Sequence, residues 1–334
     1  MTDRNAKQGN SRLSGAALFS LCAAVLFVCF VLYARWGSYL KFSSRAETDF
    51  TSEVPEEYMS PCEHPGTVIR IDYPTKDYRN NRDIHKPAFI YLPYGYEENG
   101  SERYDVMYMM HGWMMKAQDY LTDDAQIRNV FDHLIENGDT RPFIAVCLTF
   151  DAENEAATYQ DSVDQLALFQ DELRNDAMPY LEAKIRTYAK GTSHKDLKAA
   201  RSHRAFAGFS MGAVTAWHQF IFNLDLIQNY IIMSGDSWIT GQNGGLLRPQ
   251  KTVDRLVNAV HDGWYGQKDY FIYTGVGTID PMHDQVDSQV QEMMRRQEFC
   301  AENMVYEIKD NGYHDMNAVR EYLYNALPAV FAGD

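Results

Sequence analysis

Cysteine is scarce in this chain, with five among 334 residues. Two of them, Cys22 and Cys29, lie in an apolar segment, and Cys147 lies in an apolar run that predicts a buried strand. That leaves Cys62 and Cys300 as one pair that a disulfide could join, a pairing that the sequence alone leaves open. No spacing of cysteine and histidine is typical of a zinc site, so we expect no metal.

Charge is absent between Arg12 and Arg35, and the stretch from Gly15 to Tyr33 is almost wholly apolar. A helix needs about 20 such residues to cross a bilayer. The stretch ends in Leu-Tyr-Ala-Arg, which is a poor cleavage site for a signal peptide. Residues 1–35 are therefore predicted to form a cytoplasmic tail and a single-pass signal anchor, with the rest of the chain extracellular. Secretion after cleavage of a signal peptide is the alternative.

Basic residues are in the minority, and the formal net charge is −15. Residues 1–45 nevertheless contain six basic residues and one acidic residue, so the acidic excess belongs to the remainder of the chain. An acidic surface repels nucleic acid and anionic membranes. We therefore expect no nucleic-acid partner, a membrane contact only through the N-terminal helix, and a neutral or sugar-linked substrate.

Internal repeats and low-complexity tracts are also absent. We expect a linker over residues 36–60 and one folded domain over 61–334, without a separate cap domain. Strands that alternate with helices predict an α/β fold, with a mostly parallel sheet, helices on both faces and an antiparallel edge. Expected strands are 67–73, 88–92, 105–110, 143–149, 205–209, 229–233, 270–274 and 304–308. Expected helices are 125–136, 163–188, 211–222, 251–261, 284–300 and 316–331.

The most informative segment that is present is Gly-Phe-Ser-Met-Gly at residues 208–212. It has the G-x-S-x-G form of a nucleophile elbow, a tight turn from strand to helix that exposes a serine hydroxyl. A short apolar run precedes Ser210 and a helical pattern follows it, as this turn requires. The glycines on either side allow strand and helix to pack closely around a strained serine.

A serine hydroxyl needs a base to accept its proton, which is normally a histidine oriented by a carboxylate. In α/β-hydrolases the acid and then the histidine follow the serine in the chain, each after a strand. Asp280 follows the strand expected at 270–274, and His314 follows the strand expected at 304–308. Asp284 and, more distantly, Asp315 remain rival candidates for the acid.

The oxyanion of a tetrahedral intermediate needs backbone N–H donors. One donor should be the N–H of Met211, directly after the serine. The second should come from Gly112 or Trp113, where an apolar strand runs into His-Gly. Side chains expected to line the substrate pocket are His111, Asp236 and Trp238.

With these residues in hand, the chain resembles the feruloyl-esterase branch of carbohydrate esterase family one, which is related to esterase D and the mycolyltransferases. The resemblance covers most of residues 62–332. It is carried by Tyr108-Met-Met-His-Gly, Arg204-Ala-Phe-Ala-Gly-Phe-Ser-Met-Gly, Ser234-Gly-Asp-Ser-Trp, Gly275-Val-Gly-Thr-Ile-Asp and Gly312-Tyr-His-Asp.

The resemblance implies an α/β-hydrolase fold in which Ser210, Asp280 and His314 are nucleophile, acid and base. It also implies cleavage of hydroxycinnamate or acetate esters of plant cell-wall polysaccharides, without a metal or organic cofactor. Many relatives continue His-Gly with further glycines, whereas Trp113, Met114 and Met115 follow here. These bulky side chains should reshape the acyl side of the pocket.

The sequence therefore favours a membrane-tethered, outward-facing serine carboxylesterase that acts on acylated carbohydrate. One alternative is a membrane-anchored acyltransferase of the mycolyltransferase type, which would hand the acyl group to a cell-envelope sugar. Another is a carbohydrate-binding domain without catalysis, which the complete order of serine, acid and histidine argues against.

Overall fold

The computed structural model describes residues 53–96, 100–153 and 157–332. The chain divides into two compact units, Met1–Arg45 and Ala46–Asp334, and the description below concerns the second. The anchor expected within residues 1–35 and most of the linker expected at 36–60 lie outside the described residues. Within the described ranges, no helix has the length and apolar character needed to cross a membrane.

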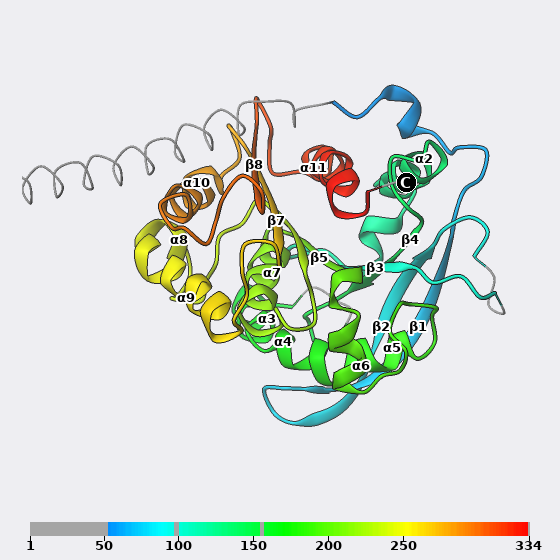
Figure 1. Ribbon diagram of the computed structural model, residues 1–334, viewed down its shortest axis with the longest axis horizontal. Helices are drawn as coiled ribbons and strands as arrows, with labels where there is room; N and C mark the ends of the chain where they lie inside the picture. The colour runs from blue at the N-terminus through cyan, green and yellow to red at the C-terminus, as the bar shows by residue number, and fades with distance from the viewer. Residues whose placement is uncertain (1–52, 97–99, 154–156, 333–334) are drawn as a thin grey trace, which may run out of the picture. The chain divides into compact units, whose positions relative to one another are not determined.

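A central sheet of eight strands organises the second unit, in the order β1-β2-β4-β3-β5-β6-β7-β8 (Figure 1). The strands are β1 Thr67–Asp77, β2 Arg82–Leu92, β3 Asp105–Met110, β4 Phe143–Leu148, β5 Arg204–Phe209, β6 Asn229–Met233, β7 Phe271–Gly277 and β8 Met304–Lys309. The pairs from β4 through β8 are parallel, and β2 pairs antiparallel with both β1 and β4. The predicted α/β class and its antiparallel edge are confirmed.

Helices cover both faces of the sheet, with α2 and α11 on one face and α7 on the other (Figure 1). The α-helices are α2 Ile127–Glu136, α3 Tyr159–Leu166, α4 Phe169–Glu172, α5 Met178–Glu182, α6 His194–Ala199, α7 Met211–Phe222, α8 Gly244–Leu247, α9 Pro249–Asp262, α10 His283–Met293 and α11 Met316–Val330. Short turns η1 Glu56–Met59, η2 Ala117–Leu121, η3 Leu173–Ala177 and η4 Arg201–His203 complete the described elements. No separate cap domain is present among them.

The prediction of one long helix at 163–188 is wrong, because this region is broken into α3, α4, the π-helical turn η3 and α5. The π turn lies directly before Pro179, which stands in the first turn of α5. Proline lacks the N–H for a regular helical bond and its ring crowds the preceding turn, so the chain changes its hydrogen-bond spacing there. The helix expected at 284–300 also ends early, at Met293, where the backbone bonds tighten into a three-residue pattern.

The packed body begins before residue 61. Tyr58 is buried in the hydrophobic core, its ring stacks on His133 at 4.6 Å, and its hydroxyl donates to Asp139. The C-terminal part of the expected linker therefore belongs to the folded unit. Cys62 and Cys300 are free thiols, so the disulfide that the sequence left open is not formed.

Candidate active site

Ser210 lies in a strained turn between β5 and α7, with φ 57° and ψ −118°. Residues other than glycine rarely adopt a positive φ, and backbone strain of this kind is concentrated at functional positions. The turn is held by the Ser210 N–H, which donates to the carbonyl of Met233 on β6 at 2.9 Å. The hydroxyl is thereby presented at the C-terminal edge of the sheet, as the G-x-S-x-G motif predicts.

Two glycines make this turn sterically feasible. A Cβ on Gly208 would lie 2.0 Å from the carbonyl oxygen of Gly212, and a Cβ on Gly212 would lie 2.0 Å from that of Met110. Both obstacles are backbone atoms, which cannot move aside as a flexible side chain can. Strand β5, helix α7 and the end of β3 therefore approach closely only because these positions carry no side chain.

The variant Gly208→Ala is therefore expected to lower the free energy of unfolding by at least about 2 kcal/mol, the scale of overpacking in a tight core. Urea denaturation of both proteins measures this difference. Gly266→Ala is a matched control, because its Cβ would meet only the Asp269 carboxylate, at 3.5 Å. Equal stability of Gly208→Ala and the control would contradict the proposed steric role.

His314 and Asp280 come together from loops after neighbouring strands. Nδ1 of His314 lies 2.9 Å from Oδ1 and 3.0 Å from Oδ2 of Asp280. Because an ionised carboxylate only accepts, Nδ1 is the donor and Nε2 remains available to accept a proton. The Asp280 side chain is fully buried and His314 is 24% exposed, so the imidazole reaches solvent while its orienting carboxylate does not. The imidazole also packs against Phe209, which directly precedes Ser210, with ring centroids 4.5 Å apart.

The environment keeps Asp280 ionised. Burial works to raise its pKa, but the hydrogen bond and charge of His314 and the N–H of Met282 bring the pKa below its ordinary value. The Met282 N–H donates to Oδ1 at 2.7 Å. A fixed negative charge at this place supports an imidazolium that forms during a reaction.

The two rival acids lie elsewhere. The Asp284 side chain is 84% exposed and its carboxylate faces His283 at 3.2 Å. Asp315 caps α11, where its carboxylate accepts from the N–H groups of Asn317 and Ala318. Of the three acids that the sequence offered, the structure places only Asp280 against His314.

The predicted oxyanion donors also lie next to the serine. A Cβ on Gly112 would be 3.1 Å from the Cβ of Ser210, so the loop after β3 lies directly against the nucleophile. Met211 is the first residue of α7, and the N–H groups of a first helical turn have no partner within the helix. Both positions therefore suit stabilisation of negative charge near the Ser210 hydroxyl, and their role as oxyanion donors stays a prediction.

His111 was predicted to line the substrate pocket, but the structure buries it completely behind the loop. Its Nδ1–H donates to the carbonyl of Gly112 at 2.7 Å, and its Nε2 accepts from the hydroxyl of Thr149 at 2.8 Å. Burial lowers the pKa of His111 to about 4, so the imidazole is neutral in this arrangement. His111 therefore fixes the loop conformation from behind.

Aromatic side chains border the site on the side of the loop after β3. Trp113 is 40% exposed, its Nε1 donates to the carbonyl of Ala157 at 3.2 Å, and its ring meets Tyr159 edge-on at 5.2 Å. The Tyr159 hydroxyl lies 3.3 Å from Oε1 of Gln242, which joins loops after β4 and β6. Tyr159 could not be predicted as a site residue, since a tyrosine at the start of a helix carries no motif.

The other two predicted pocket residues bond to each other. The Nε1–H of half-buried Trp238 donates to Oδ1 of Asp236 at 2.9 Å. Asp236 itself is buried, and its Oδ2 accepts from the N–H of Gly245 at 2.7 Å. Asp236 therefore orients Trp238 and the loop that contains α8, and the indole is the part of this pair that reaches the surface.

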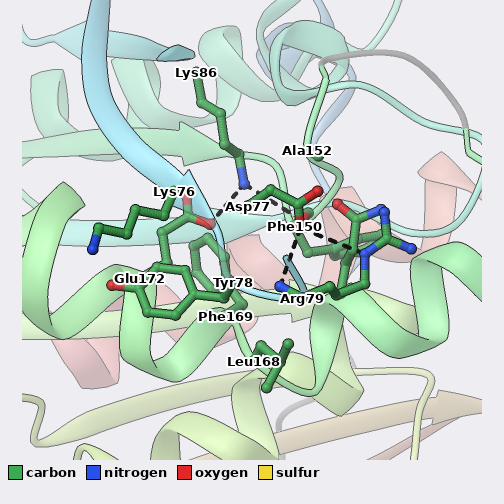
Figure 2. Close-up of a pocket in the computed structure, with 11 residues that line it drawn as sticks. Lys76, Asp77, Tyr78, Arg79, Lys86, Phe150, Ala152, Leu168, Phe169 and Glu172 are labelled. Atoms are coloured by element: carbon green, nitrogen blue, oxygen red, sulfur yellow. Dashed lines mark hydrogen bonds and ion pairs between the residues drawn. The ribbon is translucent and has the colours of Figure 1, made fainter. Parts of the chain in front are cut away.

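A separate small pocket contains none of these residues (Figure 2). It is lined by the β1–β2 hairpin, the end of β4 and the segment of α3 and α4. The buried Lys86 points into it and forms an ion pair with Glu172 at 2.8 Å. Phe150, which also lines the pocket, packs on His111, with ring centroids 4.8 Å apart. The pocket thus lies behind the loop that His111 supports.

One surface cluster has side chains of the kind that bind metals. The possible ligand atoms of Glu63, His64 and Glu136 all lie within 4.8 Å of one another. Nδ1 of His64 lies 2.8 Å from Oε1 of Glu136, so these two already form an exposed ion pair. The cluster contains none of the predicted site residues.

This chain matches a protein-family model and is similar to known proteins. A family model described as "Putative esterase" matches residues 81–329. Endo-1,4-beta-xylanase Y of Acetivibrio thermocellus is 29% identical over 284 residues, which are 83% of this chain and 24% of the xylanase. An endo-1,4-beta-xylanase/feruloyl esterase of Xylanibacter ruminicola is 28% identical over 130 residues, or 38% of this chain and 16% of that protein. The chain thus spans about a quarter or less of the length of these relatives.

Solved structures of esterases are also similar to this chain. The feruloyl esterase module from Clostridium thermocellum, in complex with sinapinate, has a TM-score of 0.75 and 28% identity. The match covers 85% of this chain and 94% of that module. A ferulic acid esterase from Anaeromyces mucronatus, with a TM-score of 0.65 and 22% identity over 83% of this chain and 96% of its own, shares the fold.

Proposed function

Since this chain belongs to the "Putative esterase" family, we propose that it is a serine carboxylic ester hydrolase of the feruloyl esterase-like type, which hydrolyses acyl esters of carbohydrates. The acyl group is feruloyl or a related hydroxycinnamoyl group, or acetyl. The observation that carries the proposal is the contact of His314 with the buried Asp280, beside the strained turn of Ser210.

In the proposed mechanism, the Ser210 hydroxyl attacks the ester carbonyl while Nε2 of His314 accepts its proton. The N–H groups of Met211 and of Gly112 or Trp113 stabilise the oxyanion of the tetrahedral intermediate. His314 then protonates the departing sugar oxygen, which leaves an acyl group on Ser210. Water, deprotonated by the same imidazole, releases the acid and restores the serine. Asp280 holds Nδ1–H throughout and stabilises the imidazolium.

The aromatic residues at the site support an aromatic acyl group. Trp238 on one loop and the pair of Trp113 and Tyr159 on two others offer flat apolar surfaces with polar edges. Such rings pack well against another ring. A hydroxycinnamoyl group has this character and acetyl does not, so we favour the former.

The site of action follows from the N-terminal segment. We propose that residues 1–35 anchor the protein in the cell membrane with the hydrolase unit outside, where polymeric carbohydrate is found. The acidic composition of the chain agrees with a substrate that carries no phosphate.

Release of ferulate from methyl ferulate tests the proposed activity. The unit 46–334 should release ferulate, and its Ser210→Ala variant should not. Serine-dependent release supports a feruloyl-type esterase. If a folded protein releases no ferulate but hydrolyses short acyl esters, the aromatic acyl group is wrong. Acylated sugar formed in preference to free acid would favour acyl transfer instead.

A further inference from the structure

Glu307 is a buried acid on β8 that the mechanism above does not use. It is 2% exposed and lies in register with Gly275 of β7, the strand that leads to Asp280. Its Oε2 accepts from the hydroxyl of Tyr273 and from Nδ2 of Asn325, the latter at 3.1 Å. Its Oε1 is buried and has no hydrogen-bond partner among the described residues. A buried polar atom without a hydrogen-bond partner is rare in folded proteins.

Tyr322 of α11 is the side chain that interacts electrostatically with both Glu307 and the proposed triad acid, Asp280. Gly275 makes room for it, since a Cβ there would be 2.7 Å from Cδ1 of the Tyr322 ring. The ring thus lies over the strand at the residue paired with Glu307. Its buried hydroxyl is within electrostatic range of both Glu307 and Asp280, and it too lacks a hydrogen-bond partner within the described ranges.

Ser234 completes the path to the triad. It follows β6 with a positive φ of 54° and is fully buried. Its hydroxyl is near enough to lower the pKa of both Asp280 and Tyr322, although it has no hydrogen-bond partner among the described residues. Oε1 of Glu307, the Tyr322 hydroxyl and the Ser234 hydroxyl are therefore three buried polar atoms without partners near Asp280. Small movements of the side chains, or buried waters between them, would join these groups by hydrogen bonds.

The protonation of Glu307 decides which of these groups donates a hydrogen bond to the next. Because Oε2 already accepts two hydrogen bonds, a proton on this acid belongs on Oε1. Burial raises the pKa of Glu307 to about 8; Glu321 acts in the same direction, and Asn325 and Lys309 oppose it. Lys309 is itself paired with Glu321. The groups that face Glu307 are Tyr273 from β7, Lys309 from its own strand, and Glu321, Tyr322 and Asn325 from α11.

We propose that Glu307 is a positioning residue, which acts as a neutral acid to hold the Asp280 carboxylate against His314. Its Oε1–H donates to the Tyr322 oxygen, the Tyr322 hydroxyl donates to Ser234, and the Ser234 hydroxyl donates to Asp280. The last bond fixes the carboxylate in the orientation that receives Nδ1–H of His314. This inference rests on the proposed triad. Loss of the Glu307 proton removes the first donor and adds a second buried negative charge near Asp280, which disorders the orienting contact.

The ratio of kcat at pH 9 to kcat at pH 7 tests this role. For the wild-type protein the ratio should be about 0.2, since with a pKa of about 8 only about one molecule in ten keeps the Glu307 proton at pH 9, and the others retain about a tenth of the activity. In Glu307→Gln the amide is a permanent neutral donor, so the ratio should approach 1. The exposed Glu302→Gln should behave as wild type. Equal ratios for Glu307→Gln and wild type would overturn the proposal.

Stability gives a readout that is independent of catalysis. The folded-state pKa of Glu307 lies above its unfolded value, so its contribution to stability is complete below about pH 4 and is lost as the pH rises through about 8. The difference in melting temperature between Glu307→Gln and wild type should therefore grow in favour of the variant from pH 5 to pH 9. A constant difference would show that Glu307 is ionised in the folded protein and would overturn the neutral-acid role.

Tyr322→Phe decides the matter if Glu307→Gln fails to fold. Loss of the central hydroxyl should lower kcat about tenfold at unchanged KM, and should make the pH 9 to pH 7 ratio insensitive to Glu307. A wild-type kcat and ratio in this variant would overturn the chain of donors. Ser210→Ala separates the two proposals, because retained activity there refutes the triad itself. An inactive Ser210→Ala with an unaltered Glu307→Gln profile refutes only the role of Glu307.

Discussion

Replacing Ser210 with alanine is expected to lower kcat for methyl ferulate by at least about 10⁴-fold, because no acyl-enzyme can form without the hydroxyl. The turn itself should persist. Alanine adopts the same positive φ at similar cost, and the N–H bond to Met233 does not involve the side chain. Initial rates with both proteins, measured together with their melting temperatures, test this expectation.

The control for this experiment is Ser202→Ala, at an exposed position in η4, which should retain wild-type rates. Activity of Ser210→Ala above about 1% of wild type would exclude Ser210 as the nucleophile. An unfolded variant would be recognised by its melting curve and replaced by Ser210→Gly, which relieves the strain of the positive φ.

Asp280→Asn is expected to lower kcat by about 10³- to 10⁴-fold, with little change in KM. An asparagine in this place can donate to Nδ1 of His314, which would leave the proton on Nε2 and remove the base. The volume of the side chain is unchanged, so the buried site should still fold. Steady-state kinetics of the variant at pH 7 give both parameters.

Asp284→Asn is the matched control, because Asp284 is four residues away and its side chain is 84% exposed. It should have the rates of the wild-type protein. Inactivation by Asp284→Asn with retained activity in Asp280→Asn would reverse the assignment of the acid. That result would require the loop after β7 to rearrange around His314.

Much of this arrangement could be predicted because its signals are local. The turn at Ser210 has glycines at fixed spacing, and the apolar runs of the strands stand between clear helical patterns. Asp280 and His314 were found by their place after two strands, and the structure brings these two side chains together. The family prediction is confirmed, since the matching family model covers residues 81–329.

The features that sequence analysis missed depend on contacts between distant segments. The break near Pro179 is an exception, since the proline is itself a local signal, although η3 also packs against β1. Tyr159 becomes a neighbour of Trp113 only when two loops meet. His111 has the position of a pocket residue in the sequence, but its bonds to Gly112 and Thr149 turn it inward.

Glu307 illustrates the same limit of local patterns. An acid in a short strand predicts an exposed side chain, and nothing in the sequence near residue 307 indicates otherwise. Its burial follows from α11, which lays Tyr322 and Asn325 over this edge of the sheet. Only the assembled fold shows that the acid lies on the path to Asp280.

Labelling with a fluorophosphonate tests whether Ser210 is a nucleophile activated by His314. The serine oxygen displaces fluoride from phosphorus, and peptide mass spectrometry locates the adduct. One adduct on the peptide that contains Ser210, absent in Ser210→Ala and formed far more slowly in His314→Ala, is the predicted result. An adduct on Ser234 or Ser237 instead, or no adduct on a folded protein that releases ferulate, would show that Ser210 is not the activated nucleophile.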